Sequence, residues 1–228
     1  MSVGEPIPII GGTGALGLGL ALRFAAAGRE VAIGSRDPGR AEEAAAKVRA
    51  RLPEAGVTGL QNTDAASLGP IVFLTVPFRA QSENLTNLAF VLERGQILVD
   101  ATAPLAAAIS GKATRLLGVP QGSAAEQAQE MVPDGVSVVS ALHTVSAKKL
   151  RDLDVRLDED VLVTGDSRED KRRVAEAIGV IPGLRPVNVG GLEAARFVEG
   201  LTPLLISLNI RNKSHAGVKL TNLPDELW

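Results

Sequence analysis

The hydrophobic positions alternate between short continuous apolar runs and longer segments with helical spacing, the pattern of a parallel sheet covered by helices. The runs at 71–76 and 136–142 lack a polar side, as strands buried on both faces do. Strands are predicted near residues 7–11, 30–34, 57–60, 71–76, 97–101, 136–142, 161–164 and 186–189. Helices are predicted near 15–27, 38–51, 80–92, 123–131 and 168–178, followed by a long last helix over about 192–212. These elements predict an α/β protein with a Rossmann-type doubly wound, mostly parallel sheet and a smaller C-terminal α/β part that ends in the long helix.

Two positions interrupt this pattern. Pro8 lies inside the first predicted strand, where it has no N–H to donate, so regular pairing is expected to begin beside or after it. Gly118, Pro120 and Gly122 break the periodicity around 116–122. This segment predicts a boundary that divides the chain into residues 1–120 and 121–228.

The length of 228 residues suits one large α/β domain or a domain with a smaller partner. With 24 basic and 26 acidic residues, the net charge is −2, which argues against nucleic acid or an anionic membrane as the main partner. The sequence shows no apolar run long enough for a transmembrane helix and no signal peptide at its start. We therefore expect a cytoplasmic protein.

Several chemically useful residue types are scarce or missing. The chain has no cysteine and no tyrosine, which excludes disulfides, thiolate metal sites, cysteine nucleophiles and a tyrosine acid. Its two histidines, His143 and His215, are too few for a metal site built mainly from imidazole, and no metal is expected. If the protein is an enzyme, a bound cofactor carries the difficult chemistry.

A glycine-rich loop follows the first predicted strand. Residues 12–17 fit G-x-G-x-x-G, with a strand before the loop, an apolar helix after it and a second strand within about 30 residues. Gly12 would make the tight turn, Gly14 would let the backbone approach a pyrophosphate, and Gly17 would let helix and strand pack closely. The start of the helix then offers N–H groups to the phosphates, so the loop predicts a dinucleotide site.

The end of the second predicted strand indicates which dinucleotide binds. An NAD site usually places Asp or Glu there, whereas this chain has Ser35 and Arg36, with Arg40 one helical turn later. A hydroxyl and two guanidinium groups suit a 2′-phosphate. Asp37 comes one or two residues late for a ribose contact and is predicted to cap the next helix. The sequence favours NADP over NAD.

With these features in place, the chain resembles the NADPH-dependent reductases of the deazaflavin coenzyme F420. The resemblance runs over nearly the whole sequence and is carried by Gly11-Gly12-Thr13-Gly14-Ala15-Leu16-Gly17, Ile33-Gly34-Ser35-Arg36, Thr75-Val76-Pro77, Ser140-Ala141-Leu142-His143-Thr144, Gly183-Leu184-Arg185-Pro186 and Leu201-Thr202-Pro203-Leu204. It implies an NADP-binding Rossmann domain at 1–120 and a smaller domain at 121–228 that completes the deazaflavin pocket and offers a dimer interface.

The resemblance also implies cofactor contacts. They fall on Gly12, Thr13, Gly14, Ala15, Leu16, Ser35, Arg36, Arg40, Thr75, Val76, Pro77, Phe78, Ala101, Ala103, His143, Val145, Ala147, Ala216 and Gly217. The implied reaction moves a hydride between C4 of the nicotinamide of NADP and C5 of the deazaflavin of F420. Both reacting groups then belong to small molecules, so no protein residue is predicted to be catalytic and the protein aligns two rings away from water.

Two other functions stay open from the residues alone. One is an NADP-dependent dehydrogenase or reductase of a small hydroxy or amino acid, with His143 or a lysine on the last helix as its acid. It is disfavoured because the helix over 192–212 contains no Lys or His. The other is an NADP-binding sensor without turnover. His143 is interpreted either as a general acid or as an imidazole that shapes the pocket or hydrogen-bonds the cofactor amide, and the second interpretation is favoured.

The sequence also contains a basic cluster and an apolar C-terminal helix. Lys148, Lys149 and Arg151 form a basic cluster, either a solvated helix face or a contact for the anionic deazaflavin tail. The apolar C-terminal helix is read either as a homodimer interface or as a face packed within one subunit.

Overall fold

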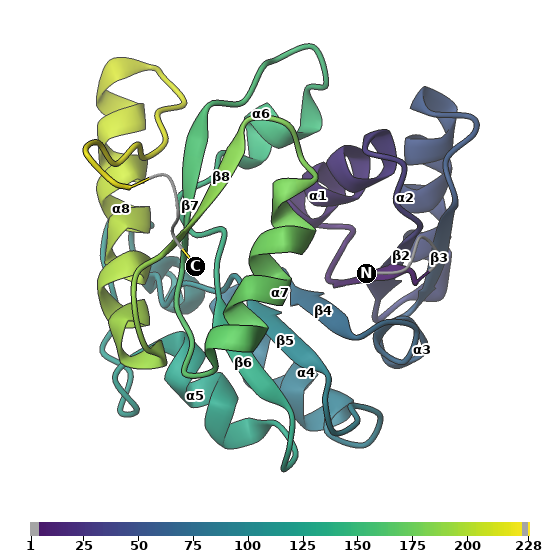
Figure 1. Ribbon diagram of the computed structural model, residues 1–228, viewed down its shortest axis with the longest axis horizontal. Coiled ribbons are helices and arrows are strands. Elements are labelled where there is room, and N and C mark those ends of the chain that lie inside the picture. Colours follow the sequence, from purple (N-terminus) through teal and green to yellow (C-terminus); the bar gives the residue numbers. More distant parts are fainter. Residues whose placement is uncertain (1–4, 225–227) are drawn as a thin grey trace.

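A computed structural model describes residues 5–224 and residue 228 of the protein (Figure 1). Its main element is a six-stranded, fully parallel sheet in the order β3-β2-β1-β4-β5-β6, and a second parallel sheet pairs β7 with β8. The strands are β1 (Ile7–Ile10), β2 (Val31–Ser35), β3 (Val57–Gln61), β4 (Ile71–Leu74), β5 (Ile97–Asp100), β6 (Ser137–Ser140), β7 (Glu159–Val163) and β8 (Leu184–Asn188). The predicted doubly wound α/β fold is confirmed.

Helices connect most of these strands. They are α1 (Ala15–Ala26), α2 (Pro38–Arg51), α3 (Asn62–Ala66), α4 (Gln81–Leu88), α5 (Ala124–Met131), α6 (Ala147–Arg151), α7 (Arg168–Gly179) and α8 (Ala195–Asn212), with 3₁₀ turns η1 (Phe78–Ala80), η2 (Ala106–Ile109) and η3 (Leu192–Ala194). Each predicted strand and helix has its counterpart, although the last helix begins at Ala195 and α4 already ends at Leu88. The sequence prediction did not include α3 and α6, which have five residues each and are too short to show helical periodicity.

Buried side chains fill both faces of the main sheet. Neighbouring residues on one strand point to opposite sides, so Ile9 packs with the cluster under α1 and α2, whereas Ile10 packs with the cluster under α4 and α5. On the first side, the rings of Phe24 and Phe73 lie 5.3 Å apart, centroid to centroid. The two covered faces explain why the strand sequences lack polar alternation.

Pro8 occupies a central strand without leaving an unmatched hydrogen bond on the β2 side. Ile7 donates its N–H to Glu30 toward β2, so the nitrogen of Pro8 faces β4. Pairing of β1 with β4 begins only at Ile9, opposite Phe73. The expectation that regular pairing begins beside or after Pro8 therefore holds toward β4, whereas pairing with β2 already begins at Ile7.

The part of the chain after residue 120 contributes to both sheets. β6 pairs with β5, with Val139 opposite Val99, and completes the main sheet. β7, α7 and β8 then form a second parallel unit, and α8 runs alongside it (Figure 1). Val198 of α8 packs against Leu162 and Val187 of β7 and β8. An isolated bridge between Ser140 and Thr164 joins the two sheets. The division into domains at residue 120 stays a prediction, since the two predicted parts share one sheet.

Candidate active site

The turn after β1 leaves the start of α1 open. Gly14 is the N-cap of this helix, and no side chain caps it by a hydrogen bond. A Cβ at Gly17 would lie 2.6 Å from both Gly12 Cα and Thr75 Oγ1, so only glycine lets helix and strands pack here, as predicted. A Cβ at Gly14 would meet only the carbonyl oxygen of Gly11, at 3.2 Å, and would otherwise project into the cleft. The first N–H groups of α1 thus carry their partial positive charge to an open surface.

A cavity of about 400 Å³ extends from this helix start to the end of β2. Its lining includes Thr13, Gly14, Ser35, Arg36 and Arg40 of the predicted site. Asp37 accepts from the backbone N–H of Gly39 (2.9 Å) and of Arg40 (3.2 Å), which confirms it as the cap of α2. Three arginines, Arg36, Arg40 and Arg79, outnumber this one carboxylate in the cavity lining, which leaves this end of the cleft net positive.

The two arginines at this end are exposed. The side chain of Arg36 is 68% exposed and forms an ion pair of 3.3 Å with Glu83, which is 58% exposed. A pair this open to water contributes little stability, so it leaves the guanidinium available to a ligand.

A second cavity, of about 460 Å³, lies over the carboxyl ends of β4, β5 and β6. The two cavities share Gly14, Thr75, Val76, Pro77 and Arg79, and together they form one cleft. The predicted residues in the second cavity are Gly14, Ala15, Leu16, Thr75, Val76, Pro77, Phe78, Ala101, Ala103, His143, Val145 and Ala147. Its lining is mostly small and apolar, and Arg79 and His143 are its ionisable groups among the described residues. Such a surface suits a flat, largely apolar ring.

His143 is buried in this second cavity and its side chain is 8% exposed. Its Nε2 lies 2.8 Å from the carbonyl oxygen of Thr102. Burial lowers the pKa of His143 to about 4, against a smaller opposing effect of the hydrogen bond to Thr102. The ring is therefore neutral at pH 7, which supports the pocket-shaping reading of this residue over the general-acid reading.

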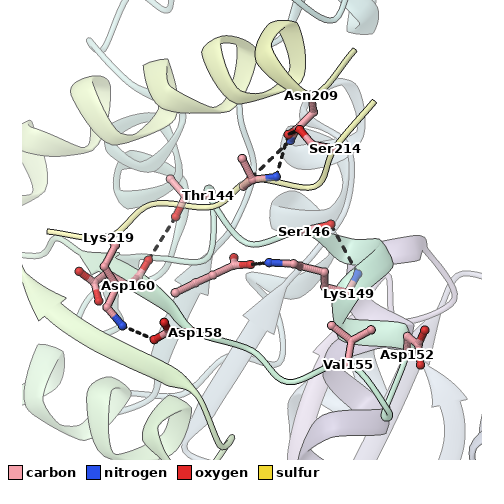
Figure 2. A network of polar contacts seen from close by, with 12 residues as sticks. Thr144, Ser146, Lys149, Asp152, Val155, Asp158, Asp160, Asn209, Ser214 and Lys219 are labelled. Carbon is pink, nitrogen blue, oxygen red and sulfur yellow. Dashed lines mark hydrogen bonds and ion pairs between the residues drawn. The ribbon is translucent and has the colours of Figure 1, made fainter. Parts of the chain in front are cut away.

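Three residues of the predicted set do not line the cleft. Gly12 is buried under the turn, where a Cβ would meet the carbonyl oxygen of Ile9 at 2.9 Å. Ala216 and Gly217 lie on the C-terminal tail between Ser214 and Lys219 (Figure 2), where Val218 accepts from the N–H of Asp160 in β7. The Ala216 N–H donates to Asn209 of α8 at 2.7 Å, and a Cβ at Gly217 would lie 2.4 Å from the carboxyl carbon of Glu159.

The basic cluster after His143 divides between two environments. Lys149 forms a 2.6 Å ion pair with Glu159, a buried carboxylate that lies against Gly217 of the tail. Lys148 and Arg151 are exposed on a shallow surface between α1, α2 and α6. The cluster is therefore not one solvated helix face, because Lys149 has a structural partner.

Some lining residues were missed by the sequence reasoning. In the larger cavity these are Arg79, Thr102, Leu105, Ala107, Ala108, Leu142 and Thr202, and toward the end of β2 they are Gly11, Asp37, Asn62, Ala80 and Asn84. Thr202 lies in the Leu-Thr-Pro-Leu stretch that carried the resemblance, and its hydroxyl donates to the carbonyl oxygen of His143 at 3.1 Å. Arg79 follows predicted Phe78 directly. Gly11 and Leu142 also lie in stretches that carried the resemblance, and the others come from segments without a local motif.

The rest of the described chain adds no other kind of centre. Within residues 5–224 no helix is long and apolar enough to cross a membrane. The same part of the chain holds no group of three or more His, Cys, Asp or Glu side chains placed to bind a metal ion.

The parallel sheet, the open glycine turn and a cleft along the carboxyl ends of the strands define a dinucleotide-binding protein of the Rossmann class. The family described as NADP oxidoreductase coenzyme F420-dependent matches residues 6–104. The chain is 45% identical over 224 residues to the F420-dependent NADP reductase of Methanothermobacter thermautotrophicus, covering 96% of each chain. It is 43% identical over 222 residues to that of Methanocaldococcus jannaschii, covering 95% of this chain and 98% of the relative. The protein belongs to the family of F420-dependent NADP reductases, and the resemblance seen in the sequence is confirmed.

A solved structure of a putative F420-dependent NADP reductase from Arthrobacter sp. FB24 has the same fold. It superimposes with a TM-score of 0.73 at 28% identity, and the match covers 93% of this chain and 96% of that one. The likeness therefore extends over the C-terminal part as well as the dinucleotide-binding sheet.

Proposed function

We propose that this protein transfers a hydride directly between NADP(H) and coenzyme F420. The observation that carries the proposal is the single cleft, which has a basic, exposed end and an apolar end whose buried imidazole is neutral. Family membership supports the same reaction, since the relatives are F420-dependent NADP reductases.

The residues of the basic end fit a dinucleotide phosphate. The open start of α1 suits the pyrophosphate, since Gly14 brings no side chain between the helix N–H groups and the cleft. Arg36 and Arg40, with the Ser35 hydroxyl, suit the 2′-phosphate. These three residues and residues 13–16 form the proposed NADP contacts, and Gly12 supports the turn beneath them.

The residues of the apolar end fit a nicotinamide and a deazaflavin ring. When bound, NADPH supplies the hydride and oxidised F420 receives it. Four apolar residues exclude water from the cavity and fix the position of the two rings: Val76, Pro77, Ala101 and Val145. Thr75 is itself fixed, because its hydroxyl donates to the carbonyl oxygen of Ile10 at 2.8 Å. Phe78, Ala103, His143 and Ala147 complete the proposed contacts, and no residue is assigned a proton-transfer role.

The structure argues against a dehydrogenase of small hydroxy or amino acids. Such an enzyme needs an acid at the reacting carbonyl, and His143 has its Nε2 engaged with a backbone carbonyl and a lowered pKa. The long helix α8 contributes only Thr202 to the described lining of the larger cavity. A non-catalytic sensor differs from the proposed enzyme in one measurable property, which is turnover.

The decisive experiment mixes the purified protein with NADPH and oxidised F420 and follows the deazaflavin absorbance. Bleaching at a rate proportional to the protein concentration is expected. NADPH carrying deuterium at the transferred C4 position should deliver its label to C5 of the deazaflavin without exchange into water. Absence of bleaching with folded protein that binds NADPH would leave the sensor function, and label in the solvent would refute direct transfer.

We also propose that two copies associate through α8. Phe197, Leu204 and Leu208 lie on one helical face at spacings of seven and four residues, and their side chains are 74%, 59% and 41% exposed. A self-complementary apolar stripe suits a two-fold homodimer. Sedimentation of Phe197→Glu/Leu204→Glu should show a monomer, whereas Phe90→Glu, at an equally exposed aromatic away from α8, should not.

The expected cytoplasmic location and absence of nucleic-acid partners stay predictions.

A further inference from the structure

The imidazole of His143 has one nitrogen committed and one without a partner. A carbonyl oxygen can only accept, so the Nε2 that lies 2.8 Å from Thr102 O carries the ring hydrogen. In a neutral ring Nδ1 is then a bare acceptor. This Nδ1 is buried and has no hydrogen-bond partner among the described residues. A buried acceptor left unmatched is costly, and this one belongs to a residue that lines the cleft.

The carbonyl that fixes this arrangement belongs to a tightly held peptide. The Thr102 N–H donates to Asp100 Oδ1 at 2.6 Å, so Asp100 caps the loop after β5. Gln81, at the start of α4, donates from Nε2 to Asp100 Oδ2 (2.5 Å) and to the Thr102 hydroxyl (2.8 Å). Gln81 and Asp100 are fully buried, and the exposed fraction of Thr102 is 1%.

The backbone around His143 is also constrained. Leu142 has a φ of +73°, a left-handed conformation that is uncommon for a bulky residue, and its side chain is 2% exposed. This turn directs the chain away from β6 so that His143 reaches the Thr102 loop. The Thr202 hydroxyl of α8 donates to the His143 carbonyl oxygen at 3.1 Å. The ring is thus held through three elements that are distant in sequence.

We propose that Gln81 and Asp100 are positioning residues: they hold the Thr102 carbonyl, which keeps His143 in its Nε2–H tautomer and presents Nδ1 as an acceptor for an N–H group of the substrate. The primary amide of the nicotinamide is the N–H donor of the right chemistry for an apolar cavity. The choice of substrate rests on the proposed function, whereas the tautomer is a property of the protein alone. His143 then serves recognition, because an unprotonated Nδ1 has no proton to give.

The chain allows a direct test, since it contains only two histidines. Protein labelled with ¹⁵N at histidine gives two ring signal sets, and His215, an exposed residue, serves as the internal reference. In the ligand-free protein at pH 7, His143 should show a protonated Nε2 and an unprotonated Nδ1. Addition of NADPH should shift the Nδ1 resonance of His143 alone.

Gln81→Met removes both donors to the Thr102 loop at nearly constant volume. It should produce a mixture of His143 tautomers and weaken NADPH binding by about three- to tenfold, the loss expected for one hydrogen bond. Gln129→Met is the matched control: Gln129 bonds to the backbone of Val136 and Val138 away from the cleft, and neither readout should change. If Gln81→Met does not fold, Asp100→Asn tests the same contact, because the new side-chain NH₂ group would face the NH₂ donor of Gln81.

Three results would overturn the proposal. They are a protonated Nδ1 in the wild-type protein, an unchanged tautomer in folded Gln81→Met or Asp100→Asn, and an Nδ1 resonance that NADPH does not move. None of these measurements uses F420. Failure of the proposed hydride transfer would appear separately, as unbleached deazaflavin in the presence of a protein with the expected tautomer.

Discussion

The two ends of the cleft use opposite physical means. At the end of β2 the side chain of Arg36 is 68% exposed and its partner Glu83 is 58% exposed, whereas His143 at the other end is buried and neutral. Exposed charge recognises a phosphate that arrives from water, since the guanidinium gives up little solvation until the ligand binds. A buried apolar end instead removes water from the place where a hydride would move. Under the proposed function, affinity and reactivity therefore depend on different regions of one cleft.

The largest effect is expected at the turn between the two ends. Gly14→Val should reduce NADPH affinity by roughly a thousandfold or more, because the branched side chain projects toward the pyrophosphate. The thermal midpoint should stay close to wild type, since φ at Gly14 is −74°, which is accessible to valine. Calorimetric titration and thermal unfolding measure the two properties. Gly118→Val, at an open loop position, is the control, and unchanged NADPH affinity in Gly14→Val would refute the role of the turn.

The apolar end should show itself in the pH dependence of stability. The pKa of His143 is lowered from 6.5 to about 4, so between these values the unfolded chain binds more protons than the folded one. The free energy of unfolding contributed by this group therefore rises as the pH increases from 4 to 6.5, by about 3 kcal/mol in total. Asp100 and Glu199 act in the opposite direction, because burial raises their pKa values to about 6 and about 8.

The contribution of His143 is isolated by comparison with His143→Gln, whose amide can still donate to Thr102. Urea unfolding at several pH values should show the wild type losing stability relative to this variant below pH 6.5. Parallel pH profiles of the two proteins would mean that the ring is not buried in its neutral form.

The basic end should determine cofactor preference. Arg36→Ala should lower kcat/KM for NADPH by roughly 10- to 150-fold, since a charge-assisted hydrogen bond contributes about 1.5–3 kcal/mol. The rate with NADH should hardly change. Arg172→Ala, at a similarly exposed ion-paired arginine on α7, should leave both rates unchanged. Equal losses with the two dinucleotides would make Arg36 a structural residue.

The smallest effect is expected for removal of the imidazole. His143→Ala should lower turnover by about tenfold, through poorer positioning of the rings rather than loss of an acid. Stopped-flow reduction of F420 at saturating NADPH measures this step, and His215→Ala serves as the control for the second histidine. A loss of about a thousandfold would instead identify a general acid and remove the contrast between the two ends.

Local patterns in the sequence were enough for much of this protein. The apolar runs predicted all eight strands, and the glycine turn with Ser35, Arg36 and Arg40 predicted the basic end of the cleft, which the structure assembles as one surface. These features depend on residues close together in the chain, where periodicity and turn chemistry act directly. The short helices α3 and α6 were not predicted, because five residues are too few to show helical periodicity. The family motifs identified residues 75–78 and His143 as expected cofactor contacts. The spacing of these residues in the sequence does not by itself define a cavity.

The fold class, the dinucleotide turn and the family thus follow from local patterns and motifs along the chain. Only the tertiary structure decided the state of His143, because its partner Thr102 lies 41 residues away and belongs to a loop held by Gln81. The positions of Ala216 and Gly217, which pack beside β7 instead of lining the cleft, were likewise visible only in the structure. So was the position of Thr202, which α8 brings to the carbonyl of His143. Burial and hydrogen bonding between distant segments set tautomer and charge, and these follow from three-dimensional packing rather than from any local pattern.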